Sequence, residues 1–474
     1  MTECKPEQLS FGSLGRREIV ASFDGGMISS DGGALLLSEV DARIGLIDRL
    51  AECFIDGRAQ QFVEHPLRQL IAQRVLGLAL GYEDLNDHDA LRRDPVLAAV
   101  SRQADVLGER RRADDAGCAL AGKSTLNRLE GSAKQSARGR YKKIVPLTEA
   151  MDELLLSLFI ESFPSAPTSL ILDIDATDDP LHGHQEGRFF HGYYDNYCYL
   201  PLYIFCGEQL LCARLRTADQ DGAAGSQEEL KRIVRRLRAT WPTTQIILRG
   251  DSGFCRDGLL SWCESEGVDY IVGLAKNARL KRAIGGEARQ AAEAFEVTQR
   301  PARVFSAFRY RTRKSWSSER WVVGKAEHLA KGENPRFIVT TLLDPACATP
   351  VAEQGRVLYE QVYCARGEME NRIKEQQMNL FADRTSCTAM PANQLRLYFS
   401  SFAYVLLQAL RRLGLAGTSL AKAQCGTLRE KLLKVGARVR ISVRKLWVSL
   451  PTAYPYAEVF MHAWRQLQML PLRI

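Results

Sequence analysis

The order of apolar segments in this sequence predicts a mixed α/β fold. A short apolar run at 169–177, SLILDIDAT, has the pattern of a buried strand that ends on acidic residues. A second run at 246–254, IILRGDSGF, has the same pattern and ends on Asp251. Two strand-like segments and one helix-like segment lie between the two runs. A buried carboxylate needs a compensating partner, so these strand ends also mark a candidate site.

Length and composition narrow the class of protein. The chain has 474 residues, of which 46% are hydrophobic and 25% are charged, so about two to four soluble domains are expected. No run of about 18 apolar residues occurs, so we expect no membrane partner. The N-terminus, MTECKPEQLSFGS, lacks the apolar core of a secretory signal. The 12 cysteines lack metal-site spacing and indicate free thiols in a reducing cytoplasm.

Basic residues gather in a few segments. The net charge is +8, and Lys and Arg concentrate at 110–112, 232–238, 309–314 and 429–445. Such patches suit a polyanionic partner, and solvated helix faces are the alternative for any one of them. The segment at 131–143, GSAKQSARGRYKK, has the composition of a basic linker or a DNA-contacting arm.

The first 145 residues are expected to be mostly helical after a glycine-rich opening. The clearest helix is LRQLIAQRVLGLAL at 67–80, which is apolar at helical spacing. Residues 117–124, GCALAGKS, match the phosphate-cradling pattern GxxxxGK[ST], so an ATPase using Gly122, Lys123 and Ser124 is a rival hypothesis. A true loop of this kind follows a buried strand, whereas the residues before this one, RRADDA, are mostly polar. We therefore favour an ordinary helix N-terminus at this position.

From residue 146 the pattern predicts a long ordered series of elements. They are a helix at 146–162, strands at 169–175, 197–206 and 209–217, a helix at 226–240, a strand at 244–249, a helix at 256–266 and a strand at 268–274. Ser226 and Glu229 are expected to form a capping box on the second helix. The order β-β-β-α-β-α-β, followed by a later helix, is that of a ribonuclease-H-like fold. In that fold the first and fourth strands are neighbours, which would bring Asp175 and Asp251 together.

A long helical stretch at 359–381 supplies further polar residues. Tyr363, Arg366, Glu370, Lys374 and Gln377 are spaced 3, 4, 4 and 3 apart, which places them on one helix face. Arg366 and Lys374 are candidates for a phosphate contact, and Tyr363 could hydrogen-bond a phosphate or stack on a base. Simple ion pairing along the helix is the structural alternative.

Asp175, Asp251 and Glu370 form the candidate catalytic set. Three carboxylates are hard oxygen ligands that suit Mg²⁺ or Mn²⁺. Two such ions could activate a water or a 3′-hydroxyl and stabilise the leaving oxygen of a phosphodiester. Each residue alone has a structural alternative, such as a turn role for Asp251, but the set in this order favours catalysis.

Polar residues also follow the first strand. His182, His184 and His191 form a short cluster there, which we interpret as polar loop residues near the mouth of the active site. Metal ligation by these histidines is the alternative. Arg188, in the same segment, could touch DNA.

Three blocks of the sequence carry a resemblance to a known family. DIDAT (173–177), LRGDSGF (248–254) and YCARGEMENRIKE (363–375) resemble the blocks of bacterial insertion-sequence DDE transposases. More narrowly, they are similar to the group with a Tyr-x2-Arg-x3-Glu-x6-Lys signature. Gln377 stands at the Lys position, and Lys374 is the substitute that we propose. The Asp-x-Thr context of the group selects Asp175 over Asp173.

The resemblance implies an activity and partners. It implies a ribonuclease-H-like catalytic core that carries out Mg²⁺-dependent DNA cleavage and strand transfer. It also implies that a dimer forms a synaptic complex with double-stranded DNA, which includes the terminal inverted repeats and the target. In relatives that cleave through a DNA hairpin, a tryptophan of the insertion stabilises a flipped base, a role that Trp316 or Trp321 could fill. Two core tryptophans are the alternative. A cytoplasmic, nucleoid-associated bacterial protein is expected.

The predicted organisation has five segments. They are a mostly helical N-terminal domain for DNA end binding (1–145), the first part of the core (146–284), a β-rich insertion (285–350), the second part of the core with the Glu370 helix (351–415), and a basic C-terminal region (416–474). The predicted function is a DNA transposase that binds its inverted repeats, cleaves the ends and joins the 3′-OH ends to target DNA by two-metal phosphoryl transfer. The alternatives are a metal-dependent nuclease of the same fold without strand transfer, and a DNA-binding protein that has lost catalysis.

Overall fold

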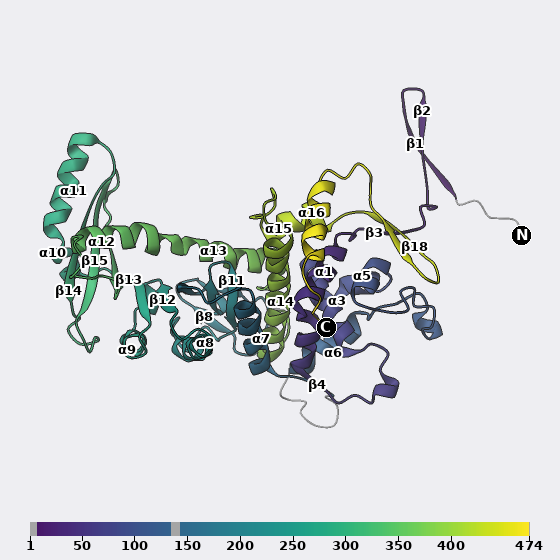
Figure 1. The fold of residues 1–474 in the computed structure, drawn as a ribbon, viewed down its shortest axis with the longest axis horizontal. Coiled ribbons are helices and arrows are strands. Elements are labelled where there is room, and N and C mark those ends of the chain that lie inside the picture. Colours follow the sequence, from purple (N-terminus) through teal and green to yellow (C-terminus); the bar gives the residue numbers. More distant parts are fainter. Residues whose placement is uncertain (1–6, 134–142, 474) are drawn as a thin grey trace, which may run out of the picture. The chain divides into compact units, whose positions relative to one another are not determined.

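The computed structural model describes residues 7–133 and 143–473 and divides into two compact units (Figure 1). Unit 1 comprises Met1–Leu147, Met378–Phe381 and Phe399–Ile474, and unit 2 comprises Thr148–Gln377 and Ala382–Tyr398. The basic segment expected at 131–143 falls largely outside the described residues. Of the helices in the described ranges, none has the length and apolar character needed to span a membrane.

Unit 2 is organised around a mixed nine-stranded sheet. Its strand order is β11-β10-β6-β12-β13-β17-β15-β14, with β16 beside β15. The bounds are β6 (Ser169–Ala176), β10 (Leu202–Cys206), β11 (Gln209–Arg214), β12 (Gln245–Gly250), β13 (Asp269–Leu274), β14 (Ala302–Tyr310), β15 (Arg320–Leu329), β16 (Gly332–Glu333) and β17 (Arg336–Thr340). β6 pairs antiparallel with β10 and parallel with β12, and β12 pairs parallel with β13. The first five strands therefore have the ribonuclease-H-like order, and the predicted fold class is confirmed.

The register of β6 and β12 explains why residues far apart in sequence meet. Ile174 lies opposite Gly250 in this parallel pair. The next residue of each strand is acidic, so Asp175 and Asp251 follow at the same edge of the sheet. The adjacency that the element order predicted is therefore observed.

Helices cover the sheet and supply the third acidic residue. They are α7 (Thr148–Glu161), α8 (Ser226–Thr240), α9 (Asp257–Ser265), α10 (Ala278–Ala283), α11 (Gly285–Thr298), α12 (Val351–Val357), α13 (Gly367–Lys374) and the first part of α14 (Met390–Gly414). Buried residues of β6, β12, α8 and α9 share one hydrophobic cluster. A small sheet, β7 (Asp179–Pro180), β9 (Asn196–Tyr199) and β8 (Phe189–His191), follows β6 in the chain.

The start of α8 differs from the prediction. The N-cap is Gly225, in the left-handed region at φ 72°, and Ser226 is already the first helical residue. The predicted capping box is therefore wrong. A glycine adopts a positive φ without steric cost, so it can begin the helix one residue earlier.

The strands expected between Asp251 and Glu370 do not form a sheet of their own. β17 pairs antiparallel with β13 and with β15, so β14, β15 and β17 continue the core sheet. The segment predicted as β-rich at 285–350 also begins with a helix, α11. One continuous sheet therefore runs from the β10–β11 hairpin to β14.

Unit 1 is largely helical and uses both ends of the chain. Its helices are α1 (Ala34–Ile44), α2 (Leu46–Glu52), α3 (Leu67–Leu80), α4 (His88–Leu91), α5 (Pro95–Val100), α6 (Lys123–Glu130), α15 (Cys425–Leu428), α16 (Ala457–Gln468) and the second part of α14. The helix predicted at 67–80 is confirmed as α3, and its residues from Leu70 onward are buried. Among the short strands, β4 (Phe54–Asp56) pairs with β5 (Ile144–Pro146), and β18 (Ala437–Ile441) pairs with both β3 (Met27–Ser29) and β19 (Leu446–Ser449).

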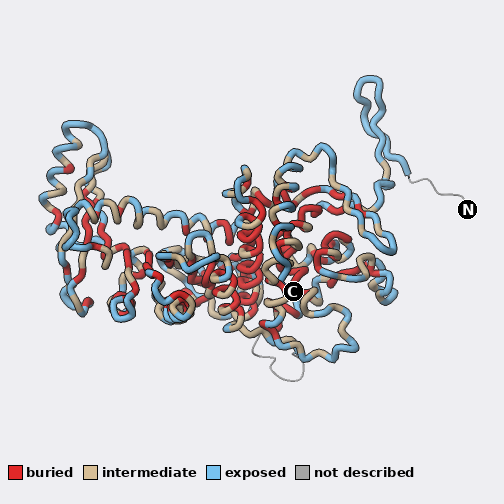
Figure 2. Tube along the Cα trace, in the orientation of Figure 1, coloured by how far each residue is buried: buried red, intermediate tan, exposed pale blue. Residues whose placement is uncertain are grey.

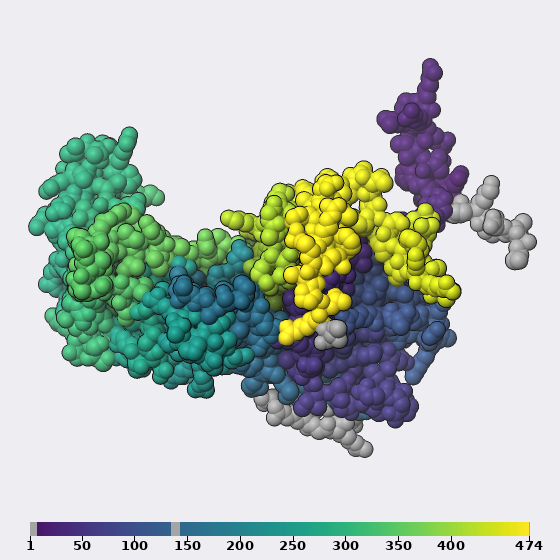
Figure 3. Space-filling view, in the orientation of Figure 1, coloured from purple at the N-terminus to yellow at the C-terminus, as the bar shows by residue number. Residues whose placement is uncertain are grey.

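Two glycines let the two ends of the chain meet closely. The backbone N–H groups of Gly32 and Gly33 donate to the carbonyls of Val435 and Leu433 at 2.8 and 3.1 Å. A Cβ atom on Gly33 would lie 2.1 Å from the carbonyl oxygen of Leu432, so no larger residue fits there. Figure 3 shows the yellow C-terminal segment lying against purple N-terminal elements of this unit.

A hairpin of unit 1 was not anticipated from the sequence. It consists of β1 (Gln8–Leu14) and β2 (Arg17–Ser22) and is exposed along almost its whole length, as the pale blue tube in Figure 2 shows. Its exposed side chains include the apolar Leu14 and Phe11. Gly15 was visible in the sequence as a possible turn residue. The two strands bury so little, however, that no alternation of buried and exposed residues marks them as strands.

Candidate active site

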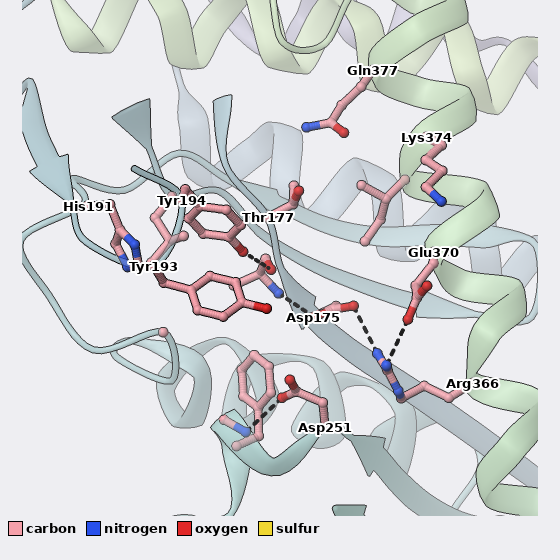
Figure 4. Close-up of a pocket in the computed structure, with 16 residues that line it drawn as sticks. Asp175, Thr177, His191, Tyr193, Tyr194, Asp251, Arg366, Glu370, Lys374 and Gln377 are labelled. Atoms are coloured by element: carbon pink, nitrogen blue, oxygen red, sulfur yellow. Dashed lines mark hydrogen bonds and ion pairs between the residues drawn. The ribbon is translucent and has the colours of Figure 1, made fainter. Parts of the chain in front are cut away.

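The predicted acidic residues come together in one pocket of unit 2. Asp175 at the end of β6, Asp251 directly after β12 and Glu370 on α13 all line a cavity of about 540 Å³ (Figure 4). Arg366 and Lys374, which flank Glu370 by one turn, line the same cavity. The three parts of the sequence therefore converge as the predicted strand order requires.

Arg366 links two of the three carboxylates. Its guanidinium group donates to Asp175 Oδ2 at 3.0 Å and to Glu370 Oε1 at 2.8 Å. The Arg366–Glu370 ion pair that the sequence allowed is thus present, and Arg366 also bonds the strand-borne Asp175. In this conformation a cation of the protein itself compensates the strand-end charge.

The environment of Asp175 disfavours its ionised form. Burial raises the pKa of Asp175 to about 6, and the nearby charges of Asp251 and Glu370 act in the same direction against the opposing Arg366. Such a carboxyl gains a great deal from an additional cation, because a cation favours its ionised form. Asp251 is held differently: its Oδ1 accepts a hydrogen bond from the Gly253 N–H at 2.8 Å, which fixes the turn after β12.

Asp173 has a different partner from Asp175. Both of its oxygens accept hydrogen bonds from Arg249, at 2.5 and 2.8 Å, and Asp173 and Arg249 are both buried. Arg249 also donates to the carbonyl of Val362 at 2.5 Å, in the helical stretch that precedes α13. The Asp173–Arg249 ion pair therefore joins β6 to β12, and Arg249 links both strands to that helical stretch.

Tyr363 supports the site from outside the pocket. Of the predicted residues on the helix face, Arg366, Glu370, Lys374 and Gln377 line the cavity, whereas Tyr363 contacts Gly273 of β13. A Cβ atom on Gly273 would lie 2.6 Å from the Tyr363 hydroxyl and 2.8 Å from the Ser252 nitrogen. The glycine thus lets the tyrosine and the Asp251 turn pack onto the same strand.

Gln377, at the position of the signature lysine, bonds a buried acid. Its amide nitrogen donates to Asp179 Oδ1 at 2.8 Å and to the Asp178 carbonyl at 3.2 Å. Burial raises the pKa of Asp179 well above its ordinary value. Burial thus disfavours the ionised form of Asp179, and the uncharged amide of Gln377 can donate to this carboxyl in either protonation state. A glutamine at the position of the signature lysine therefore suits its surroundings.

The two tryptophans of the insertion differ in environment. Trp316 is 5% exposed and packs edge-on against Tyr310, with Arg320 5.3 Å from its ring. Trp321 on β15 is half-buried, with Arg309 over its ring at 5.4 Å. The burial of Trp316 favours the core role that the sequence left open as the alternative to a DNA contact.

The segment resembling a nucleotide-binding loop has another use. The residues before it form a short 3-10 turn, Ala113–Asp115, and Gly122 is the N-cap of α6. The backbone N–H of Lys123 donates to Asp89 at 3.0 Å, and its ammonium group pairs with the same carboxylate at 3.1 Å. The carboxylate of Asp89 therefore lies where a bound phosphate would lie in a nucleotide-binding loop, which agrees with an ordinary helix N-terminus.

Aromatic residues of the site were missed in the sequence. His191, Tyr193 and Tyr194, from the β8–β9 hairpin, line the same pocket as the acidic residues. Of the three histidines expected near the mouth of the active site, His191 lines the pocket, and His182 and His184 are not among its lining residues. The tyrosines had a visible signal, the aromatic-rich run FFHGYYDNYCY at 189–199, which begins fewer than twenty residues after Asp175.

The donor set suits a hard divalent cation. Three carboxylates offer only oxygen, the ligand that Mg²⁺ and Mn²⁺ prefer. Among the described residues, no three His, Cys, Asp or Glu side chains are close enough to share one ion in this conformation. The three carboxylates therefore fit the cation in chemistry, and in this conformation Arg366 bonds two of them, Asp175 and Glu370.

The comparisons with known proteins identify the family. A family model described as "Transposase DDE domain group 1" matches residues 11–472. The chain belongs to this family. The resemblance to DDE transposases drawn from the three sequence blocks is thereby confirmed.

The comparison with solved structures adds one similar transposase. The chain is similar to piggyBac transposase, seen by cryo-EM in a synaptic complex with hairpin DNA, at 12% identity, with 85% of this chain and 79% of that chain covered and a TM-score of 0.42. The comparison with curated proteins gave no match.

Proposed function

We propose that this member of the DDE transposase family binds the ends of its own element, cleaves them and joins the 3′-OH ends to target DNA. Asp175, Asp251 and Glu370 are assigned the catalytic role. One observation carries the assignment: acidic residues from two strand ends and a distant helix line a single pocket. The pocket also holds Arg366 and Lys374, cations that suit a phosphodiester substrate.

We assign Mg²⁺ or Mn²⁺ to the three carboxylates. When bound, such ions activate the attacking oxygen and stabilise the leaving oxygen of a phosphodiester. The chain positions the carboxylates on rigid elements: Asp175 on a sheet strand and Asp251 in a hydrogen-bonded turn. Arg366 can exchange its carboxylate partners for a phosphate oxygen, and Lys374 adds a point charge one turn along the helix.

Exposed basic residues suit the DNA-binding part of this function. On β18, Ala437 and Val439 are buried whereas Arg438 and Arg440 are exposed, so the strand presents a basic face. Arg429, at the start of the same basic segment, instead donates to the carbonyls of Leu78 and Ala79 and is structural. We assign double-stranded DNA as the partner and a homodimer as the form that brings two ends together.

The test is cleavage of a labelled duplex that carries the DNA flanking the gene for this chain. The native chain is expected to cut at the element boundary only when Mg²⁺ or Mn²⁺ is present, and Glu370→Gln is expected to abolish the cut while leaving binding intact. Glu368→Gln is the matched control, because Glu368 lies on the same helix and is exposed outside the pocket. Equal activity of the two variants would refute the assignment of Glu370.

A second assay separates the transposase from its alternatives. A pre-cleaved end with a free 3′-OH is incubated with plasmid target, and joined product is measured. Cutting without joining would mean a nuclease of the same fold. Binding without cutting by the native chain would mean a DNA-binding protein that has lost catalysis.

A further inference from the structure

The β8–β9 hairpin carries an exposed aromatic ring to the candidate catalytic pocket. Tyr193, in the turn of this hairpin, is 85% exposed and lines the pocket together with Asp175 and Asp251. Figure 4 shows its side chain extending from the hairpin toward the acidic residues. An exposed tyrosine ring at such a place contributes little to the core and is available to a ligand.

Neighbouring groups hold this ring in place. Tyr193 packs nearly perpendicular to Tyr194, with ring centroids 5.0 Å apart, and Tyr194 in turn contacts the His191 ring at 5.0 Å. The Tyr194 hydroxyl donates to the carbonyl of Ala176 at 3.4 Å, one residue after Asp175. The ring of Tyr193 therefore packs on a tyrosine that is itself hydrogen-bonded to the end of β6.

The chemistry of the pocket selects the class of ligand. Three carboxylates with two cations suit a phosphodiester, and an aromatic ring beside them suits the base attached to that phosphate. Bases within a duplex are covered on both faces by their neighbours, so a protein ring can stack only on an unpaired base or a terminal one. Base–aromatic stacking is tolerant of sequence because every base has a π-face.

We propose that Tyr193 stacks on an unpaired base next to the phosphodiester that occupies the pocket of Asp175, Asp251 and Glu370. The inference rests on the proposed function, because it takes the pocket to hold a DNA strand. It adds a binding subsite, built by the β8–β9 hairpin, for a nucleotide freed from pairing at the cleavage point. Tyr193 is thus a positioning residue that orients the strand.

The experiment measures binding of two pre-cleaved ends in EDTA, which prevents cleavage. One end is fully paired, and the other carries an unpaired 2-aminopurine next to the cut. The native chain is expected to prefer the unpaired end by about 5- to 150-fold and to quench the 2-aminopurine fluorescence. Tyr193→Phe should keep both effects, and Tyr193→Leu should lose them, because leucine is apolar but has no π-face.

A control on the same hairpin makes the result specific. Phe190 is 52% exposed and packs against Tyr197 outside the pocket, so Phe190→Leu should retain the preference. An equal preference in the native chain and Tyr193→Leu, or no preference in the native chain, would overturn the inference. Failure of the proposed function is distinguishable, since it is the absence of metal-dependent cleavage by the native chain.

Discussion

Asp175→Asn is expected to stabilise the metal-free protein while abolishing cleavage. The pKa of Asp175 is about 6 in the folded chain, against an ordinary value of 3.8, and its side chain is only 17% exposed. Each unit of pKa difference corresponds to 1.36 kcal/mol, so keeping Asp175 ionised at pH 8 costs the folded state about 3 kcal/mol. An asparagine has a similar shape and no charge, and it removes this cost.

The effect must depend on pH in a defined direction. Below about pH 4 the carboxyl is protonated in both the folded and the unfolded chain, so the native chain and the variant have similar free energies of unfolding. As the pH rises through about 6, the folded state must give up a proton that the unfolded state has already released, so the native chain loses stability. The expected advantage of the variant is therefore about 3 kcal/mol at pH 8 and under about 1 kcal/mol at pH 4.

Urea unfolding in EDTA at pH 4 and pH 8 measures this difference. Fluorescence of Trp241 and Trp262, which are both buried in unit 2, follows unfolding of the unit that holds the site. Glu368→Gln serves as the control for loss of an exposed carboxylate. Equal stability of variant and native chain at pH 8, or the same gain at both pH values, would refute the electrostatic argument.

Three further substitutions test other contacts of the site. Asp173→Asn should destabilise unit 2 by about 3 kcal/mol in urea unfolding, since it leaves the buried Arg249 without its charged partner; stabilisation, as expected for Asp175→Asn, would contradict the structural role. Gly273→Ala should lower stability by about 1–3 kcal/mol and reduce cleavage, because the added Cβ atom would meet the Tyr363 hydroxyl. Adding Tyr363→Phe should recover part of the lost stability in the same unfolding assay. No recovery would exclude this contact as the cause. Asp179→Asn should change stability by less than about 1 kcal/mol, because burial raises the pKa of this carboxyl and so favours its uncharged form, which asparagine resembles; a loss above about 3 kcal/mol in the same unfolding assay would contradict this reasoning.

Local patterns in the sequence were sufficient to predict the core strands. A sequence pattern directly reflects which faces of an element are buried. This is why the apolar runs predicted β6 and β12, and why helical periodicity predicted α3 and α8. The order of these elements then predicted that Asp175 and Asp251 would meet. The catalytic roles of these residues and the domain boundaries remain predictions.

Contacts between distant segments could not be predicted in the same way. Asp173 and Asp175 share a strand face, so spacing alone could not show that Arg249 bonds the first and Arg366 the second. The strands β14, β15 and β17 have clear strand patterns, but nothing local specifies that β17 pairs with β13. The aromatic run around Tyr193 was visible, but only the folded hairpin shows that it faces the site.

The way in which unit 1 is assembled has a consequence for the order of synthesis. Its first 147 residues contribute β3, whose partner β18 belongs to the last part of the chain, while all of unit 2 is encoded in between. At about 5–20 residues per second, a ribosome needs roughly 20–60 s to make the rest of the chain, including β18, after the first 147 residues. A nascent or truncated chain can therefore complete the nine-stranded sheet of unit 2 before unit 1 has closed. If unit 1 selects the DNA ends, a chain that stops before β18 lacks that selection even though its core sheet has formed.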